Sequence, residues 1–136
     1  MGVCTLVASG VNFDVDEYLR ESPFEVLNVF HRGEAVPPLE NPKARPLSDS
    51  GFVAVVSHDE LPHLLDQAAE ALDFLETHEE ELRRLKGFGV DAMVLDFRIP
   101  QGMSTHPTHF LPPELIEAMG RLKMGLLFSL VDIMRN

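Results

Sequence analysis

The sequence is poor in cysteine and tryptophan and has no long apolar run. Its one cysteine, Cys4, cannot form an internal disulfide, which is typical of proteins in a reducing compartment. The longest apolar run near the C-terminus, GLLFSLV, is far shorter than the roughly 20 residues that a transmembrane helix needs. The N-terminal MGVCTLVASG lacks the basic and long apolar segments of a secretion signal. We therefore expect a cytoplasmic protein with no membrane partner.

Basic residues are also scarce. The chain has 11 Lys and Arg against 22 Asp and Glu, so its formal net charge is −11. This charge repels the phosphates of nucleic acids. The small basic groups at 43–45 and 83–86 are not interleaved with aromatic patches, so we expect no nucleic-acid partner. The charge is compatible with a basic protein partner.

The chain does contain enough apolar material for one folded domain. It has 136 residues, the size of an ordinary domain, and 45% of them are apolar. It has no phosphate-binding glycine loop and no dinucleotide fingerprint. We expect a single domain covering 1–136.

Hydrophobic periodicity predicts alternating strands and helices along this domain. Strands are expected at 3–8, 25–31, 51–57, 91–99 and 126–133, and helices at 14–22, 59–86 and 113–122. Residues 33–50 carry four prolines and no periodicity, which indicates a long loop. A second loop is expected at 100–112.

Helix starts carry recognisable signals. Asp14 and Glu17 have the spacing of a capping box, and Phe13 and Tyr18 have the spacing of a hydrophobic staple. For the long helix we prefer Asp59 as the N-cap, because the following proline then falls in the first turn, where backbone N–H groups are unpaired. Gly87 or Gly89 is expected to end that helix.

The strand at 91–99 alternates between a core face and a second face. Its expected core residues are Met93, Leu95, Phe97 and Ile99. The order β-α-β-β-α-β-α-β begins with the six elements of a ferredoxin-like split βαβ unit. We expect an α+β fold with the helices on one face of a mainly antiparallel sheet. The other face, with Val94, Leu127 and Val131, is apolar enough to predict a homodimer.

Three segments resemble a known family. They are FDVDEYLRESPFEVLNVFHRGE, LLDQAAEALDFLETHEEELRRLKGFG with the strand after it, and LPPELIEAMGRLKMGLLFSLVDI. Together they resemble domain-of-unknown-function family 4279, a group of small cytosolic bacterial proteins. The resemblance implies an α+β fold and supplies no catalytic residues to transfer. The proline-rich 33–50 loop and the His-Pro-Thr-His segment depart from that family's pattern.

Two histidines in the segment STHPTH, His106 and His109, form the candidate metal site. Zinc needs such imidazoles together with a third and usually a fourth ligand. The third-ligand candidates are Asp96 first, then His58 and Glu114. The alternative is a polar loop whose histidines face water or bind backbone groups. We expect the polar loop, because nothing in the sequence assembles the ligands.

Other residues of catalytic types are better explained by roles in the fold. Ser57, His58 and Asp59 are the residue types of a hydrolase triad, but neighbouring residues point in different directions and cannot form one relay. We expect His78 to lie at the edge of the core, and Cys4 to act as a small buried apolar residue.

These observations favour a non-enzymatic protein-binding or regulatory module, of which an immunity protein or antitoxin would be one form. The rival is a small metal-dependent enzyme or metal sensor that uses the histidines of 104–109. A third possibility is a small-ligand site between the 33–50 and 100–112 loops, which the sequence neither supports nor excludes.

Overall fold

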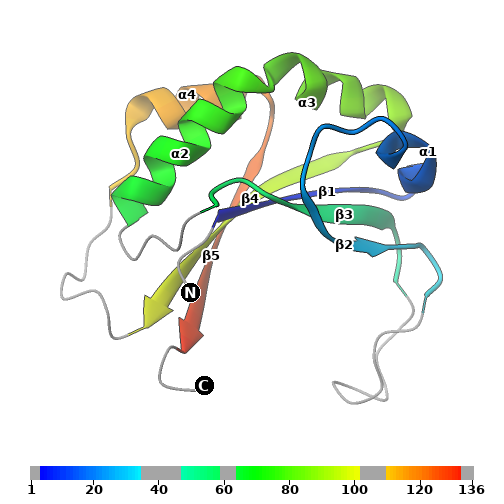
Figure 1. The fold of residues 1–136 in the computed structure, drawn as a ribbon, viewed down its shortest axis with the longest axis horizontal. Helices are drawn as coiled ribbons and strands as arrows, with labels where there is room; N and C mark the ends of the chain where they lie inside the picture. The colour runs from blue at the N-terminus through cyan, green and yellow to red at the C-terminus, as the bar shows by residue number, and fades with distance from the viewer. Residues whose placement is uncertain (1–3, 35–46, 59–63, 102–109, 133–136) are drawn as a thin grey trace.

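A computed structural model describes residues 4–34, 47–58, 64–101 and 110–132. They form an α+β fold with a five-stranded mixed sheet (Figure 1). The strands are β1 (Cys4–Gly10), β2 (Val26–Phe30), β3 (Ser50–Val55), β4 (Ala92–Gln101) and β5 (Gly125–Asp132). The helices of these residues are α1 (Val15–Leu19), α2 (Leu64–Thr77), α3 (Glu79–Leu85) and α4 (Pro113–Arg121).

The sheet has the strand order β2-β3-β1-β4-β5. The central strand β1 is antiparallel to both β3 and β4, and β2 is antiparallel to β3. The last strand, β5, is parallel to β4, because α4 carries the chain back to the starting edge between them. The sequence predicted a mainly antiparallel sheet; the sheet is mixed, with the parallel pairing confined to β4 and β5.

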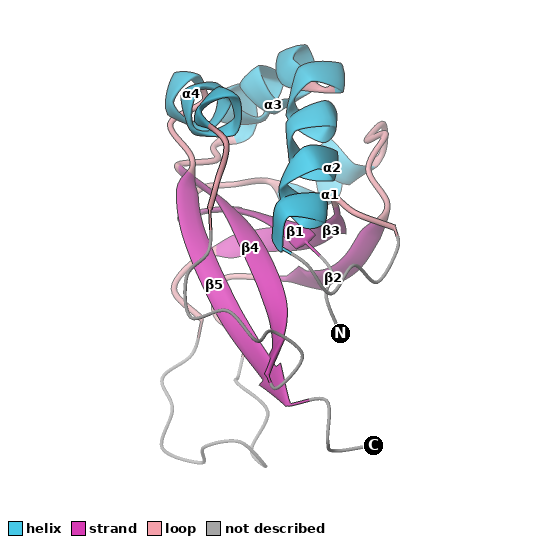
Figure 2. Cartoon of the chain, turned by 90° about the vertical axis from the view of Figure 1, so that its left-hand side faces the viewer, coloured by secondary structure: helices cyan, strands magenta, loops and turns pink. Residues whose placement is uncertain are grey.

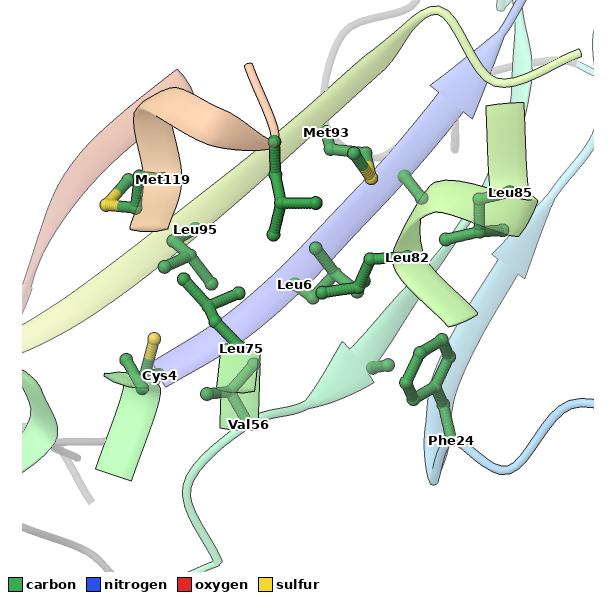
Figure 3. Packing of buried hydrophobic residues seen from close by; sticks show 14 of the residues in the cluster. Cys4, Leu6, Phe24, Val56, Leu75, Leu82, Leu85, Met93, Leu95 and Met119 are labelled. Atoms are coloured by element: carbon green, nitrogen blue, oxygen red, sulfur yellow. The ribbon is translucent and has the colours of Figure 1, made fainter. Parts of the chain in front are cut away.

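All the described helices cover one face of the sheet (Figure 2). The core lies between them and alternate residues of the strands, such as Leu6 of β1. Figure 3 shows Leu6 and Leu95 of the sheet facing Leu75, Leu82 and Leu85 of the helices. The predicted alternation of β4 is confirmed: its buried residues are Met93, Leu95, Phe97 and Ile99.

The start of α1 has the predicted Asp14 cap but only half of the predicted capping box, because the N–H of Asp14 donates to Phe88 O and the Glu17 carboxylate pairs with Arg20. An Oδ1 oxygen of Asp14 accepts a hydrogen bond from the N–H of Glu17 at 3.2 Å. The rings of Phe13 and Tyr18 lie 6.1 Å apart, as expected for the staple. The cap and the staple together fix where the chain enters this five-residue helix.

The expected single long helix is divided at His78, whose φ of −111° and ψ of 20° are not helical. Leu75 of α2 and Leu82 of α3, one on each side of this bend, belong to the same core. The predicted N-cap, Asp59, lies outside the described residues. At the other end, a 3₁₀ turn (Lys86–Phe88) follows α3, and Gly89 ends it with a φ of 102°, one of the two predicted positions.

Backbone hydrogen bonds join the two sides of the predicted 33–50 loop. The N–H of Gly33 donates to Leu47 O, and the N–H of Leu47 donates to Glu34 O, both at 2.9 Å. Residues 35–46 lie outside the described part of the chain. None of the described helices is long and apolar enough to span a bilayer.

Candidate functional site

The predicted metal ligands are not brought together in the described part of the chain. His106 and His109 lie outside it. Asp96 lies on β4, half-buried, and accepts a hydrogen bond from the Ser129 hydroxyl of β5 at 2.7 Å. His58 lies 3.2 Å from a carboxylate oxygen of Glu25. Among the described residues, no group of three His, Cys, Asp or Glu side chains could hold a metal ion.

Ser57 and Cys4 could act as nucleophiles by residue type, but both are buried and contribute to packing. The buried Ser57 hydroxyl accepts a hydrogen bond from the N–H of Cys4 at 2.8 Å and so ties β1 to the end of β3. The Cys4 side chain is fully buried. Its burial, and then the charge of Asp96, raise the pKa of the thiol far above its ordinary value. Cys4 therefore stays a thiol at neutral pH, whereas cysteine chemistry needs the thiolate.

A shallow hollow lies beside these residues at one end of the sheet. Its volume is about 170 Å³, below the roughly 300–1,000 Å³ of small-molecule sites. It is lined by Cys4, Thr5, Glu25, Leu27, Val55, Ser57 and His58.

His31, at the end of β2, lies between two carboxylates. Its Nε2 is 3.0 Å from Asp16 of α1, and its Nδ1 is 3.3 Å from Glu34. The hydrogen bond to Asp16 raises the pKa of His31 most, desolvation opposes that rise in part, and the hydrogen bond to Glu34 adds a further rise. The cluster links the β2 end to α1, and its two carboxylates favour the protonated, charged form of His31.

A second polar cluster joins α1 to α3. Tyr18 is fully buried, and its hydroxyl donates a hydrogen bond to the carboxylate of Glu81. Arg84 donates to the same carboxylate at 3.1 Å and places its guanidinium over the rings of Tyr18 and Phe88, at 5.3 and 5.0 Å. Burial, and then the Glu81 hydrogen bond, raise the pKa of Tyr18. Burial acts to raise the pKa of Glu81, but hydrogen bonds from Arg84 and Tyr18 outweigh it and lower that pKa.

The sheet face opposite the helices is uncovered by any described helix or strand (Figure 2). Val7 of β1 is the register partner of Val53 in β3 and of Val94 in β4. These three half-buried side chains form a valine row across the centre of the face. Around the row, the same face carries the polar Thr5, Ser9, Asp96 and Arg98 and also the apolar Val55 and Leu127.

The face also includes part of the apolar surface predicted for a dimer. Leu127, the register partner of Asp96, is 52% exposed. The backbone of Val131 belongs to β5, but its side chain lies outside the described residues. Three further residues of β5 are exposed although they lie on the helix side. They are Leu126 at 41%, Phe128 at 47% and Leu130 at 62% exposure.

Sequence reasoning missed the His31 and Tyr18 clusters. Asp16 and His31 come from different elements, and 63 positions separate Tyr18 from Glu81. Nothing in a single sequence signals such pairs. The sequence showed that the strand is apolar on both faces. It did not show that Leu126, Phe128 and Leu130 are exposed.

Comparisons with known proteins add no relative. No protein-family model, no curated protein and no solved structure matches this chain.

Proposed function

We propose that this chain is a non-enzymatic protein-binding module of the cytoplasm, and that it binds its partner through the uncovered sheet face. The observation that carries the proposal is the valine row of Val7, Val53 and Val94. These side chains lie side by side at the centre of the uncovered face, with Ser9 and Asp96 among their polar neighbours. Protein interfaces have this composition, an apolar centre with a polar rim.

A protein fits this face better than a small molecule does. Four hollows lined by described residues have volumes of about 170–230 Å³, whereas the sheet face can be covered by another folded surface. The net charge of −11 would speed the approach of a basic partner and oppose that of an acidic one. A regulator that masks a basic protein, as an immunity protein or antitoxin does, is the form of this function that the charge supports.

We also propose that β1-α1-β2-β3-α2-α3-β4 is a ferredoxin-like unit to which α4 and β5 are appended. The order β2-β3-β1-β4 with antiparallel pairings supports this assignment. The resemblance to family 4279 remains a hypothesis of ancestry that agrees with an α+β fold.

The test is a pull-down from cells of the source organism at low and high salt, followed by binding of the purified partner to each variant. Val53→Lys with Val94→Lys places two charges on the valine row. Leu65→Lys places one charge on the helix side, at a residue that is 57% exposed. We expect the wild type and Leu65→Lys to bind the partner more tightly at low salt, and the double variant to lose binding while keeping its circular dichroism.

Failure of the wild type to recover any protein at either salt concentration would contradict the proposal. Equal binding by the folded double variant would place the interface elsewhere.

A further inference from the structure

The strand β5 is an edge strand with the properties of a pairing surface. It has eight residues and is hydrogen-bonded only to β4 among the described strands. Residues 125–131 contain neither a charge nor a proline. Folded proteins blunt free strand edges with charges, prolines, bulges or short strands. Apart from its last residue, Asp132, β5 has none of these protections, and no other described strand pairs with its outer edge.

The opposite edge of the same sheet does carry such protections. The strand β2 has five residues. Its pairing with β3 is interrupted by a register shift between Val26 and Asn28, and a bulge of this kind twists a strand edge away from further pairing. The two edges therefore differ, and the long, regular one is apolar.

The side chains of β5 are exposed on both faces of the sheet. Leu126, Phe128 and Leu130 are register partners of the buried Leu95, Phe97 and Ile99 of β4, so they lie on the helix side. Figures 1 and 2 both show the ends of β4 and β5 projecting past the helices. Exposure of 41–62% on these large side chains leaves apolar surface that a neighbouring strand would cover.

We propose that β5 pairs in antiparallel fashion with β5 of a second copy of this chain, so that two sheets join into one of ten strands. A two-fold axis normal to the sheet at Phe128 sets Phe128 opposite itself and Leu126 opposite Leu130. The strand is thus complementary to itself, as a two-fold interface requires. On the uncovered face, the same register sets Leu127 opposite Ser129.

Charge identifies a second copy as the occupant. Each chain carries −11, which opposes association wherever charged surfaces meet. The 125–131 stretch contributes none of that charge, so two copies meet there with the least repulsion. A basic partner gains nothing from this neutral edge, whereas an identical strand matches it over residues 125–131, a length of about 24 Å.

This geometry differs from the face-to-face dimer that the sequence predicted through Val94, Leu127 and Val131. Two chains side by side leave the valine row uncovered in both. The inference therefore goes beyond the proposed partner binding, and either one can fail without the other. A strand edge buries less than the about 800 Å² per chain of stable interfaces, so the dimer is expected to be reversible.

Light scattering after size-exclusion chromatography tests the surface. At about 100 μM, where dimers with a Kd near 10 μM are mostly formed, we expect twice the 15.2 kDa chain mass. Leu130→Lys changes a residue that is 62% exposed, and Leu65→Lys changes one that is 57% exposed. We expect Leu130→Lys to halve the mass and Leu65→Lys to leave it unchanged. A monomeric wild type, or a dimeric Leu130→Lys, overturns the proposal.

Disulfide trapping tests the register. Cys4 is the only native cysteine and is fully buried. Any disulfide between chains must therefore come from the added surface cysteine. Directly opposed residues of antiparallel strands have Cα atoms about 4.5–5.5 Å apart, within disulfide range. An equimolar mixture of Leu127→Cys and Ser129→Cys is expected to form the cross-linked dimer upon mild oxidation, far more than either variant alone. Equal cross-linking by Leu127→Cys alone, or by Val53→Cys on the sheet face, would overturn this pairing.

Discussion

Tyr18 of α1 donates its hydroxyl hydrogen bond to Glu81 of α3, although 63 positions separate them in the chain. The phenol ring stacks on Phe52 of β3, with ring centroids 5.7 Å apart and planes 6° apart. The carboxylate also accepts from Arg84, whose guanidinium lies over the Tyr18 ring. One tyrosine therefore holds the first helix to the third through both its ring and its hydroxyl.

Removal of the Tyr18 hydroxyl tests that link. We expect Tyr18→Phe to lower the free energy of unfolding by about 1–2 kcal/mol, because a hydrogen bond to a charged acceptor is lost while the ring stays buried. Urea unfolding measures the change. Combining Tyr18→Phe with Glu81→Ala in a double-mutant cycle isolates the coupling of the pair. A coupling near zero would show that the contact adds no stability.

His31 gives a prediction about pH. Its folded-state pKa is raised above the ordinary 6.5 by Asp16 and Glu34. The stabilisation is thus fully present below about pH 6.5 and is lost as the pH rises through the folded-state pKa. We expect the Tm difference between the wild type and His31→Gln to be largest near pH 5.5 and to shrink by pH 8.5.

The control for this pH effect removes the first partner. Asp16→Asn should move the His31 ring titration, followed by NMR, back toward the ordinary pKa. A Tm difference between the wild type and His31→Gln that does not change with pH would contradict the linkage.

Gly10 and Gly87 differ in how much space a side chain would have. A Cβ added at Gly10 would lie 2.1 Å from the carbonyl oxygen of Gly89, whereas one added at Gly87 meets nothing within 4 Å. We expect Gly10→Ala to destabilise the fold by about 3 kcal/mol or more, because backbone must move. Gly87→Ala should be neutral or stabilising by about 0.4–1 kcal/mol. Thermal unfolding measures both, and a Gly10→Ala variant as stable as the wild type would show that this contact yields easily.

The histidine segment 104–109 gives a prediction about metal. The one described candidate ligand on β4, Asp96, is already hydrogen-bonded to Ser129. We therefore expect less than one zinc per chain after purification, unchanged in His106→Ala and His109→Ala. Elemental analysis measures the metal content. Stoichiometric zinc that both substitutions remove would establish the rival metal site.

Local features of the fold could be read from the sequence because they depend on neighbouring residues. The Asp14 cap, the alternation of β4 and the αL residue at Gly89 are of this kind. The bend at His78 was missed, because the apolar stripe continues on both sides of it and periodicity alone does not report a break.

Strand order could not be obtained in the same way. An edge strand and a central strand can have the same apolar pattern, and the sequence of β5 reads like that of a buried strand. Only the pairing shows that Leu127 and Leu130 lie at an edge. The Asp16 and His31 contact likewise depends on how α1 and β2 meet.

The central place of β1 has a consequence for synthesis. Among the described strands β1 is made first, yet one of its two neighbours, β4, is made only after β2 and β3, since Cys4 pairs with Phe97. Until then one side of the N-terminal strand has no partner in the final sheet, and its apolar residues must be shielded by temporary contacts or by a chaperone. Truncated nascent chains that end before β4 should therefore be protease-sensitive, and chains that extend past it should become resistant.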